Sequence, residues 1–326
     1  MSAERELWFT GQRQVEVREG APCPPLAPGE AKARALHSGI SQGTELLLYR
    51  GEGPRVFDPS LDIPGTPVYP RRYGYSWVGE IVESRSPDAQ VGQRVFALRP
   101  HGDVHVLRPE AIRNIPASIP SARATLAANV ETALTVVWDA GIAIGDRVLV
   151  MGGGMVGLLV AMLARLAGAR QVSVVEPSPL RRQAALALGA HGVWPPEEDL
   201  PKGEFDVVIE ATGDPACLDR AIAHAGVEAT IVVASFYGER CSPVALGADF
   251  HRRRLQLKAS QVSRIPPHKT SRWDTERRFA LVVDYLRDPR LDTLVDNPIP
   301  FAEAPMVFAR LDADPGAALH SVFAYR

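Results

Sequence analysis

The chain has 326 residues, of which 46% are hydrophobic, and a formal net charge of −2. This length suggests two domains with ample core. The nearly balanced charge gives no electrostatic footprint for nucleic acid or an anionic membrane, and no apolar stretch is long enough to span a membrane. The three cysteines are scattered and the first residues lack the apolar core of a signal peptide, so we expect a cytoplasmic protein without a disulfide framework.

The first part of the chain, to about residue 120, predicts a β-rich domain of barrel or sandwich type. Short runs of β-branched and apolar residues alternate there with turns that contain Gly and Pro. The predicted strands are 6–10, 14–17, 31–36, 78–83, 92–97 and 103–107.

From about residue 121 the pattern changes to strands alternating with helices, which predicts an α/β domain with a doubly wound parallel sheet. The predicted strands are 147–151, 172–175, 207–212, 230–234 and 255–260, and the predicted helices are 122–139, 158–167, 181–188, 216–224 and 275–286. The tail is expected to return to the first domain. The predicted domains are therefore 126–262 for the α/β part, and 1–125 with 263–326 for the β-rich part.

A glycine-rich segment joins the first strand of the α/β domain to its helix. Gly152, Gly154 and Gly157 match the pattern G-x-G-x-x-G at this position. The first glycine permits a tight turn, the second lets the backbone approach a pyrophosphate, and the third lets helix and strand pack closely. Met155 and Val156 lie inside the motif, and the N-terminus of the helix that follows offers free N–H groups that suit phosphate. The segment therefore predicts dinucleotide binding.

The choice of cofactor depends on Glu176, which closes the second strand about twenty residues beyond the motif. A carboxylate at this position hydrogen-bonds the adenosine ribose diol and repels a 2′-phosphate. Arg181 and Arg182 follow one turn later and either soften this preference or lie on the helix surface. We predict NAD(H), with NADP(H) left open.

Five segments, in this order and spacing, resemble signatures of the medium-chain dehydrogenase/reductase superfamily: 39–45, 74–82, 91–96, 144–150 and 210–213. The resemblance implies a β-rich GroES-like catalytic domain and a Rossmann dinucleotide-binding domain. It also implies hydride transfer between NAD(P)H and a carbonyl, alcohol or enone in the cleft between the domains. Segments 38–45 and 260–263, with Arg272 and Trp273, resemble the branch of the bacteriochlorophyllide 3-hydroxyethyl dehydrogenases, so a tetrapyrrole side-chain alcohol is the alternative substrate.

Zinc-containing members of this superfamily hold the metal by a Cys, a His and a further Cys or Glu. The resemblance places Gln42, Tyr75 and roughly Ala128 at these positions, and none of the three is a plausible zinc ligand. Glu45 and Glu131 lie nearby as substitutes, but lone carboxylates are usually solvated or paired with a cation. We therefore predict no metal site and no zinc.

Without zinc, side chains must handle the alkoxide that forms when hydride reduces a ketone. Tyr75 is either the acid that protonates this oxygen or an aromatic filler of the space a metal would take. Ser41 and Thr44 either hydrogen-bond the substrate oxygen or stabilise a turn. An enone or quinone substrate would demand less of the protein. A non-catalytic dinucleotide-binding or redox-sensing protein is the alternative of a different class.

The resemblance implies further cofactor contacts and a partner. Thr132 lies on the helix that enters the nucleotide domain, Thr212 belongs to the 210–213 signature, and Phe236 follows a strand at the carboxyl edge of the sheet, where ligands bind. The edge strand 255–260 often pairs across a homodimer in this family, which is the oligomer we expect. The basic run 251–254 is interpreted as a guard beside that edge and not as a nucleic-acid site.

Overall fold

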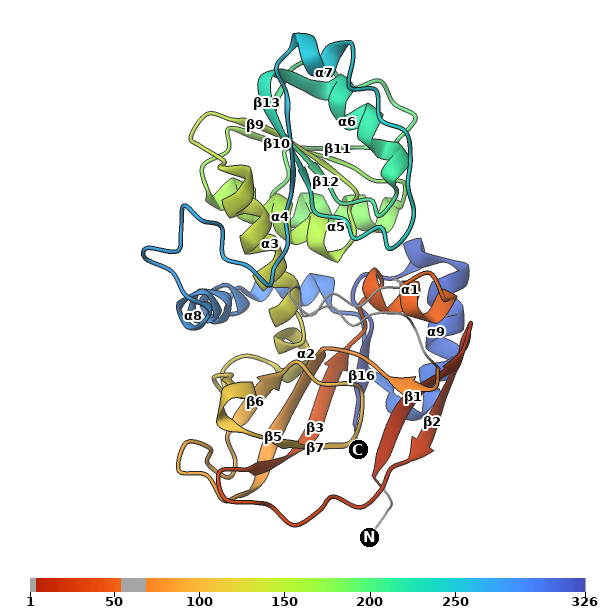
Figure 1. Cartoon of the computed structure of the whole chain (residues 1–326), viewed down its shortest axis with the longest axis vertical. Helices are drawn as coiled ribbons and strands as arrows, with labels where there is room; N and C mark the ends of the chain where they lie inside the picture. Colours follow the sequence, from red (N-terminus) through yellow and green to blue (C-terminus); the bar gives the residue numbers. More distant parts are fainter. Residues whose placement is uncertain (1–3, 54–68, 326) are drawn as a thin grey trace. The chain divides into compact units, whose positions relative to one another are not determined.

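A computed structural model describes residues 4–53 and 69–325 of the chain (Figure 1). The chain forms two compact units, unit 1 (Met1–Ala128 with Val283–Arg326) and unit 2 (Asn129–Val282). The sequence places the junctions at 125/126 and 262/263, whereas residues 263–282 group with unit 2 in the structure. A buried ion pair within unit 2 accounts for part of this difference, since Arg278 Nη2 lies 2.8 Å from Glu131 Oε1.

Unit 1 contains a mainly antiparallel sheet with the strand order β15-β16-β3-β5-β6-β8, in which β7 also pairs with β3. Its strands are β3 (Ala31–Gly39), β5 (Ser76–Ser84), β6 (Arg94–Ala97), β7 (Val104–Leu107), β8 (Arg113–Asn114), β15 (Ile299–Pro300) and β16 (Val322–Ala324). Alternate residues of β3 point inward, so that Ala31, Ala33 and Ala35 pack against Trp77 and Ile81. This sheet confirms the β-rich domain.

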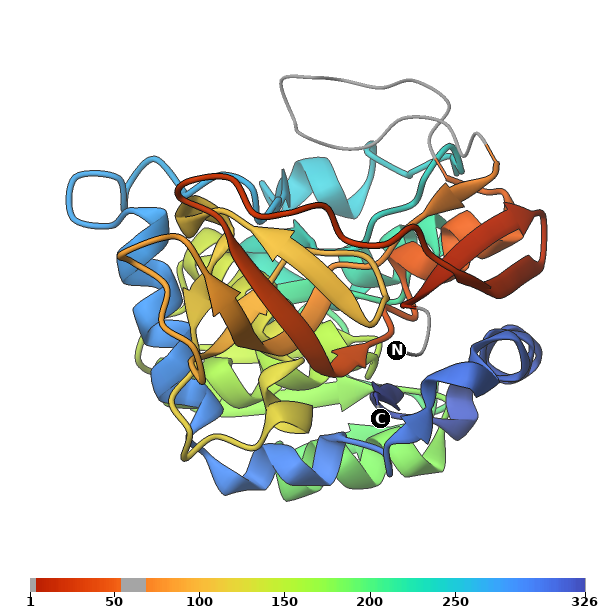
Figure 2. The ribbon, with the colours of Figure 1, turned by 90° about the horizontal axis from the view of Figure 1, so that it is seen from below.

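A second sheet of unit 1, in the order β2-β1-β4, lies beside a helical layer. Figure 2 shows the hairpin of β1 and β2 next to α1. The elements are β1 (Arg5–Gly11), β2 (Gln14–Glu19), β4 (Arg71–Arg72), α1 (Thr44–Arg50), α2 (Ser121–Ala124), α9 (Ala304–Ala313), and the 3-10 helices η2 (Pro109–Ala111), η4 (Pro289–Leu294), η5 (Phe301–Glu303) and η6 (Pro315–Ala317). Phe9, Leu46 and Phe308 are fully buried in their shared core.

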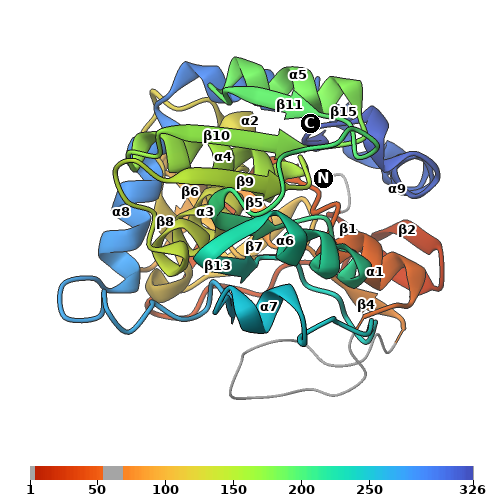
Figure 3. The ribbon, with the colours of Figure 1, turned by 90° about the horizontal axis from the view of Figure 1, so that it is seen from above.

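Unit 2 is built on a parallel sheet in the order β11-β10-β9-β12-β13-β14, and the arrows of β9, β10 and β11 point the same way in Figure 3. Its strands are β9 (Arg147–Met151), β10 (Gln171–Val175), β11 (Gly192–Trp194), β12 (Phe205–Glu210), β13 (Ala225–Val233) and β14 (Gln256–Ala259). β9 is a Val- and Leu-rich run buried along most of its length, as expected for a strand covered on both faces.

Helices cover both faces of this sheet, with α4 and α5 on one side and α6 on the other (Figure 1). The helical elements are α3 (Ala127–Ala140), α4 (Met155–Leu166), α5 (Pro179–Ala187), η3 (Pro215–Cys217), α6 (Leu218–His224), α7 (Asp249–Arg252) and α8 (Thr275–Leu286). This arrangement confirms the doubly wound parallel sheet. Among the described residues, no helix combines the length and the apolarity that crossing a membrane requires.

One predicted helix is divided in the structure. The sequence predicts a continuous helix over 122–139, but α2 ends at Ala124 and α3 begins at Ala127. Thr125 causes the interruption, because its hydroxyl donates to the carbonyl of Ala122 at 2.6 Å. Such a bond from a side chain to the backbone competes with helical hydrogen bonds.

Candidate active site

The glycine turn of unit 2 has the geometry that its sequence pattern predicts. Gly152 has a φ of 96°, and a Cβ there would lie 2.5 Å from the Ala211 carbonyl oxygen. A Cβ at Gly157 would lie 1.9 Å from the Gly152 carbonyl oxygen. By contrast, no described atom lies within 4 Å of the position that a Cβ on Gly154 would take. Gly152 and Gly157 are therefore needed for close packing, whereas Gly154 leaves the backbone of the turn accessible.

Helix α4 begins directly after this accessible glycine. Gly154 is its N-cap residue, and no described side chain caps the helix. The N–H groups of Met155 and Val156 belong to the first turn, where an α-helix offers no internal acceptor. Together with the positive end of the helix dipole, they suit a phosphate group. The residues of the turn thus fit the pyrophosphate of a dinucleotide.

Glu176 lies beside the turn and is only 3% exposed. Its Oε2 accepts from the Gly153 N–H at 2.6 Å, and its Oε1 accepts from the Ser178 N–H at 2.9 Å. Each carboxylate oxygen has a second lone pair, which suits a ribose hydroxyl. Arg182 donates to the backbone carbonyls of Glu176 and Pro177, each at 2.7 Å. Its guanidinium group therefore lies beside the backbone of Glu176.

A second buried carboxylate orders the loop after β12. Glu210 is fully buried and accepts from the backbone N–H of Thr212 at 2.7 Å, and from the Thr212 hydroxyl. The Tyr237 hydroxyl donates to its other oxygen at 2.5 Å. Burial, followed by this hydrogen bond, raises the pKa of Tyr237 well above its ordinary value. The Thr212 hydroxyl also accepts from the Asp214 N–H at 3.0 Å, so it serves the loop itself.

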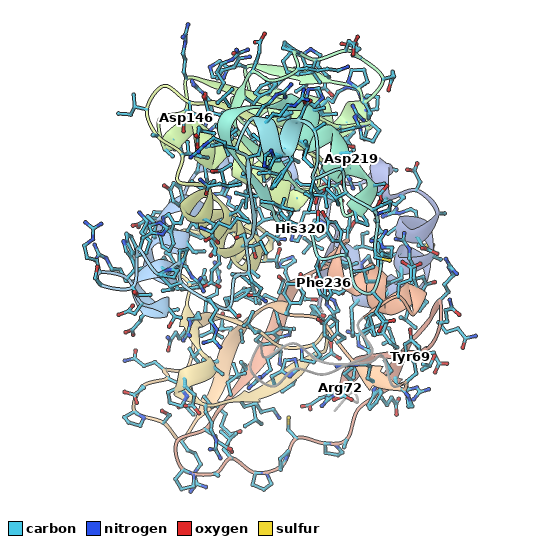
Figure 4. All side chains as sticks on the ribbon, turned by 45° about the horizontal axis from the view of Figure 1, so that its top comes forward. Tyr69, Arg72, Asp146, Asp219, Phe236 and His320 are labelled. Atoms are coloured by element: carbon cyan, nitrogen blue, oxygen red, sulfur yellow. The ribbon has the colours of Figure 1, made fainter. Side chains whose placement is uncertain are left out.

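The predicted cofactor residues differ in how closely the structure joins them. The turn approaches both Glu176 and the Ala211–Thr212 backbone. The Arg181 N–H donates to the Ser178 hydroxyl at 3.5 Å. Phe236 follows β13 and is 41% exposed; Figure 4 shows it at the opposite end of unit 2 from Asp146. Thr132 lies half-buried in α3. The roles of these residues stay predictions.

In unit 1, the three predicted catalytic residues form one hydroxyl cluster, defined here as Ser41, Thr44 and Tyr75. The Tyr75 hydroxyl donates to Ser41 Oγ at 2.5 Å, and the Thr44 N–H donates to the same oxygen at 3.2 Å. Burial raises the pKa of Tyr75 above its ordinary value, although its hydrogen bonds with Ser41 and Thr44 oppose this rise. The lowered pKa that an efficient tyrosine acid needs at neutral pH is therefore not provided.

A buried polar network lies behind the hydroxyl cluster, and sequence reasoning did not identify it. Glu45 accepts from the Ser41 N–H at 2.9 Å, and its other oxygen lies 2.8 Å from His101 Nε2. His101 Nδ1 lies 2.6 Å from the Ser38 hydroxyl, which lies 2.6 Å from the Tyr325 hydroxyl. No spacing in the sequence points to His101, because its partners come from distant parts of the chain.

The residues at the zinc positions do not fit a zinc ion. The Gln42 side chain donates to the carbonyl of Leu319 at 3.0 Å, Tyr75 carries a protonated phenol, and Ala128 has no ligand atom. Zinc takes thiolate, imidazole or carboxylate ligands. In the described ranges, residues 4–53 and 69–325, no three His, Cys, Asp or Glu side chains gather closely enough to share a metal.

The two carboxylates offered as substitute ligands have other partners. Both oxygens of Glu45 accept hydrogen bonds inside the buried network. Glu131 Oε1 accepts from Arg278 Nε at 2.9 Å, and the Arg278 side chain is 4% exposed. Breaking a buried pair of this kind usually costs about 3–5 kcal/mol, so Glu131 is held by its cation.

Three comparisons with known proteins agree with this architecture. A family model described as zinc-binding dehydrogenase matches residues 155–278, a range that contains none of the zinc positions. The 2-desacetyl-2-hydroxyethyl bacteriochlorophyllide A dehydrogenase of Cereibacter sphaeroides is 31% identical over 280 residues, 79% of this chain and 80% of that protein.

Two solved structures share the fold. The 2R,3R-butanediol dehydrogenase of Bacillus subtilis has a TM-score of 0.81 at 21% identity and covers 99% of this chain and 100% of its own. A zinc-binding dehydrogenase from Sinorhizobium meliloti, bound to NADP, has a TM-score of 0.79 at 20% identity and covers both chains fully. With the 31% identical relative matched over four-fifths of its length, the chain belongs to the medium-chain dehydrogenase/reductase superfamily and is an oxidoreductase.

Proposed function

We propose that the protein transfers hydride between NAD(H) and a carbonyl, alcohol or enone substrate without a catalytic zinc ion. The observation that carries this proposal is the hydroxyl cluster Ser41–Thr44–Tyr75, which occupies the part of the sequence where zinc members supply metal ligands. The glycine turn and Glu176 supply the complementary requirement, a site for a dinucleotide. The reaction needs both the hydroxyl cluster and the dinucleotide site.

The cofactor would be held by three parts of unit 2. Gly154 and the first turn of α4 would bind the pyrophosphate, and Glu176 would accept from the adenosine ribose. Bound there, the nicotinamide ring supplies or accepts the hydride. Phe236, with its ring exposed at the carboxyl end of the sheet, and Thr132 are proposed to contact the nicotinamide side.

The substrate oxygen would be bound by hydroxyl groups of the cluster in unit 1. Hydride addition to a ketone builds negative charge on that oxygen, and preorganised donors stabilise it more in the transition state than in the ground state. For an enone or quinone the charge spreads into an enolate, so the same donors have less to stabilise. We therefore expect the cluster to matter more for ketones than for enones.

A screen of the purified protein tests the proposal. NADH oxidation would be followed with ketones, enones and quinones, and NAD reduction with secondary alcohols such as 2,3-butanediol. We expect turnover with at least one of these acceptor or donor classes. Tight NADH binding without turnover of any of them would contradict the proposal and favour a non-catalytic role.

We expect NAD(H) to be preferred because Glu176 is a buried carboxylate beside the turn. The value of kcat/KM should be about tenfold or more higher with NADH than with NADPH, which equals about 1.4 kcal/mol. Glu176→Gln should narrow this preference, since it removes the charge that repels a 2′-phosphate. Glu198→Gln, at an exposed carboxylate of the same unit, is the matched control. A tenfold preference for NADPH would refute the assignment.

A tetrapyrrole side-chain alcohol is the second candidate substrate. It is favoured by the relative from Cereibacter sphaeroides, whose name states action on a hydroxyethyl bacteriochlorophyllide. The discriminating assay supplies that hydroxyethyl pigment with NAD and follows both NADH formation and the pigment's absorption. Turnover that exceeds the rate with 2,3-butanediol would favour this candidate, and an unchanged pigment would remove it.

We also propose that the protein forms a homodimer through β14. This strand closes one edge of the parallel sheet, and Leu257 on it is 41% exposed. An apolar edge strand is a template for pairing with another chain. In the neighbouring basic run, Arg253 pairs with Asp249 and Arg254 with Glu228. Light scattering should give about twice 35.3 kDa; a monomer would contradict the proposal.

A further inference from the structure

Ser41 is the member of the hydroxyl cluster whose proton has no acceptor among the described residues. A hydroxyl provides one donor and two acceptor lone pairs. Ser41 Oγ accepts from the Tyr75 hydroxyl at 2.5 Å and from the Thr44 N–H at 3.2 Å, so both acceptor positions are used. The group of Ser41 that is left is its O–H donor, which is available to an oxygen that binds beside it.

Tyr75 is placed to support Ser41 more than to act on a substrate itself. Its proton lies in the short bond to Ser41, and its oxygen is also hydrogen-bonded by Thr44. Donation from a phenol polarises the serine hydroxyl and makes that hydroxyl a better donor. In this order Thr44, Tyr75 and Ser41 form one chain of hydrogen bonds that ends in a serine O–H.

Glu45 holds both backbone polar groups of Ser41. Its carboxylate accepts from the Ser41 N–H at 2.9 Å, and its own N–H donates to the Ser41 carbonyl at 3.0 Å. These two bonds fix the backbone of Ser41 and with it the direction of its Cα–Cβ bond. The bonds from Tyr75 and Thr44 then hold the hydroxyl itself.

His101 fixes Glu45 in turn, and this contact exceeds what a helix cap requires. Glu45 is fully buried and the His101 side chain is 1% exposed, with Nε2 of the imidazole 2.8 Å from the carboxylate. Ser38 and then Tyr325 continue the chain of hydrogen bonds on the far side of the ring. Burying a carboxylate and an imidazole is expensive unless every polar atom is bonded. A surface cap at the start of α1 would need none of these partners.

We propose that Ser41 is the catalytic residue that donates to the substrate oxygen, and that Glu45 and His101 are positioning residues that hold it in place. This inference rests on the proposed hydride transfer and assigns its oxygen-binding group. In ketone reduction the hydride adds to carbon and the carbonyl electron pair moves to oxygen. Ser41 stabilises that oxygen by its O–H, and the proton that finally neutralises it is taken from solvent through the hydroxyl cluster.

The test compares variants in NADH-dependent reduction of 2,3-butanedione. Ser41→Ala should lower kcat about 10²–10³-fold, with little change in KM, because the bond strengthens mainly in the transition state. Ser41→Thr, which keeps a hydroxyl, should recover part of this loss. Tyr75→Phe should lower kcat only about tenfold, the usual effect of one lost hydrogen bond. Ser118→Ala, at an exposed serine of unit 1, and Tyr285→Phe are the controls.

The positioning pair is tested by two further substitutions. Glu45→Ala should lower kcat about tenfold or more without changing the NADH dissociation constant, and Glu45→Gln, which keeps an acceptor for Ser41, should restore most of it. His101→Gln should give an intermediate kcat. Urea unfolding of each variant separates this loss from a loss of fold, because a merely structural role would lower stability and leave kcat per folded molecule unchanged.

The outcomes separate this inference from the proposed function. A Tyr75→Phe loss larger than that of Ser41→Ala would assign the oxygen to Tyr75 and overturn the inference. A Ser41→Ala enzyme with the wild-type kcat would also overturn the inference about Ser41, but it would leave the proposed hydride transfer unaffected. Wild-type protein that turns over none of the ketones, enones, quinones and secondary alcohols would overturn the proposed function, and the inference with it.

Discussion

Replacing Gly157 by alanine should destabilise unit 2 severely, whereas alanine at Gly154 should leave the fold intact and weaken cofactor binding. A Cβ at Gly157 would lie 1.9 Å from the Gly152 carbonyl oxygen. Gly152 is itself closely surrounded, because a Cβ built on it would lie 2.5 Å from the Ala211 carbonyl oxygen and 2.8 Å from the Thr212 nitrogen. Overpacking of this kind costs about 1–3 kcal/mol, and more where only backbone can move.

Gly154 provides the matched control within the same motif. Its φ of −65° and ψ of 177° are open to any residue, and no described atom lies within 4 Å of the added Cβ position. We expect its alanine variant to unfold in urea within about 0.5 kcal/mol of the wild type. Its NADH affinity should fall about tenfold or more, because a methyl group would lie where a pyrophosphate approaches. Equal stability losses, or wild-type NADH binding by Gly154→Ala, would contradict this account.

Mild acid should destabilise the protein through two histidines of unit 1, the buried His320 and the half-buried His105. Burial lowers the pKa of His320 to about 4, from an ordinary value of 6.5, and the pKa of His105 also to about 4. Between about pH 4 and pH 6.5, the unfolded chain binds more protons than the folded protein. The free energy of unfolding should therefore be highest above pH 6.5 and fall as the pH decreases toward 4, by roughly 3 kcal/mol per histidine.

His320→Gln isolates one of the two contributions. His320 Nε2 lies 2.9 Å from the Thr125 hydroxyl, which donates to Ala122, so the ring donates and an amide can replace it. Urea unfolding at several pH values should show about half the acid loss in this variant. His268→Gln, at an exposed position, controls for the substitution itself. An unfolding free energy that stays constant from pH 7 to pH 4.5 would refute the prediction.

Local patterns predicted the parts of the structure that are set by neighbouring residues. The glycine turn, β9 and α4 follow from one continuous segment, in which Gly152 and Gly157 have steric reasons that the structure bears out. The helix 275–286 was predicted with the bounds it has. The doubly wound sheet followed from the alternation of strands and helices, since crossovers of this length allow few other topologies.

Features that depend on distant partners could not be predicted in the same way. Glu45 lies in a segment that the sequence singles out, but its partner His101 lies 56 residues away. Tyr325 joins the same network across 287 residues. The helix α1 was treated as part of a signature segment, so its start at Thr44 was missed. Burial by tertiary packing, and not local propensity, determines these positions.

The hydroxyl cluster falls between these two cases. The resemblance to the superfamily brought Ser41, Thr44 and Tyr75 into one list of candidates, but only the structure joins them by hydrogen bonds. The sequence left Tyr75 as either an acid or a filler. Its raised pKa and its bond to Ser41 favour a third role, in which it supports a serine that meets the substrate.

Hydride transfer without zinc can be tested by measuring the metal content of the active protein. Metal would be quantified by mass spectrometry in the same preparation whose NADH-dependent turnover is measured, before and after dialysis against a chelator. We expect zinc far below one equivalent and turnover that survives chelation, because Gln42, Tyr75 and Ala128 offer no ligand set for zinc. One equivalent of zinc, with activity lost on chelation and restored by adding zinc, would contradict it.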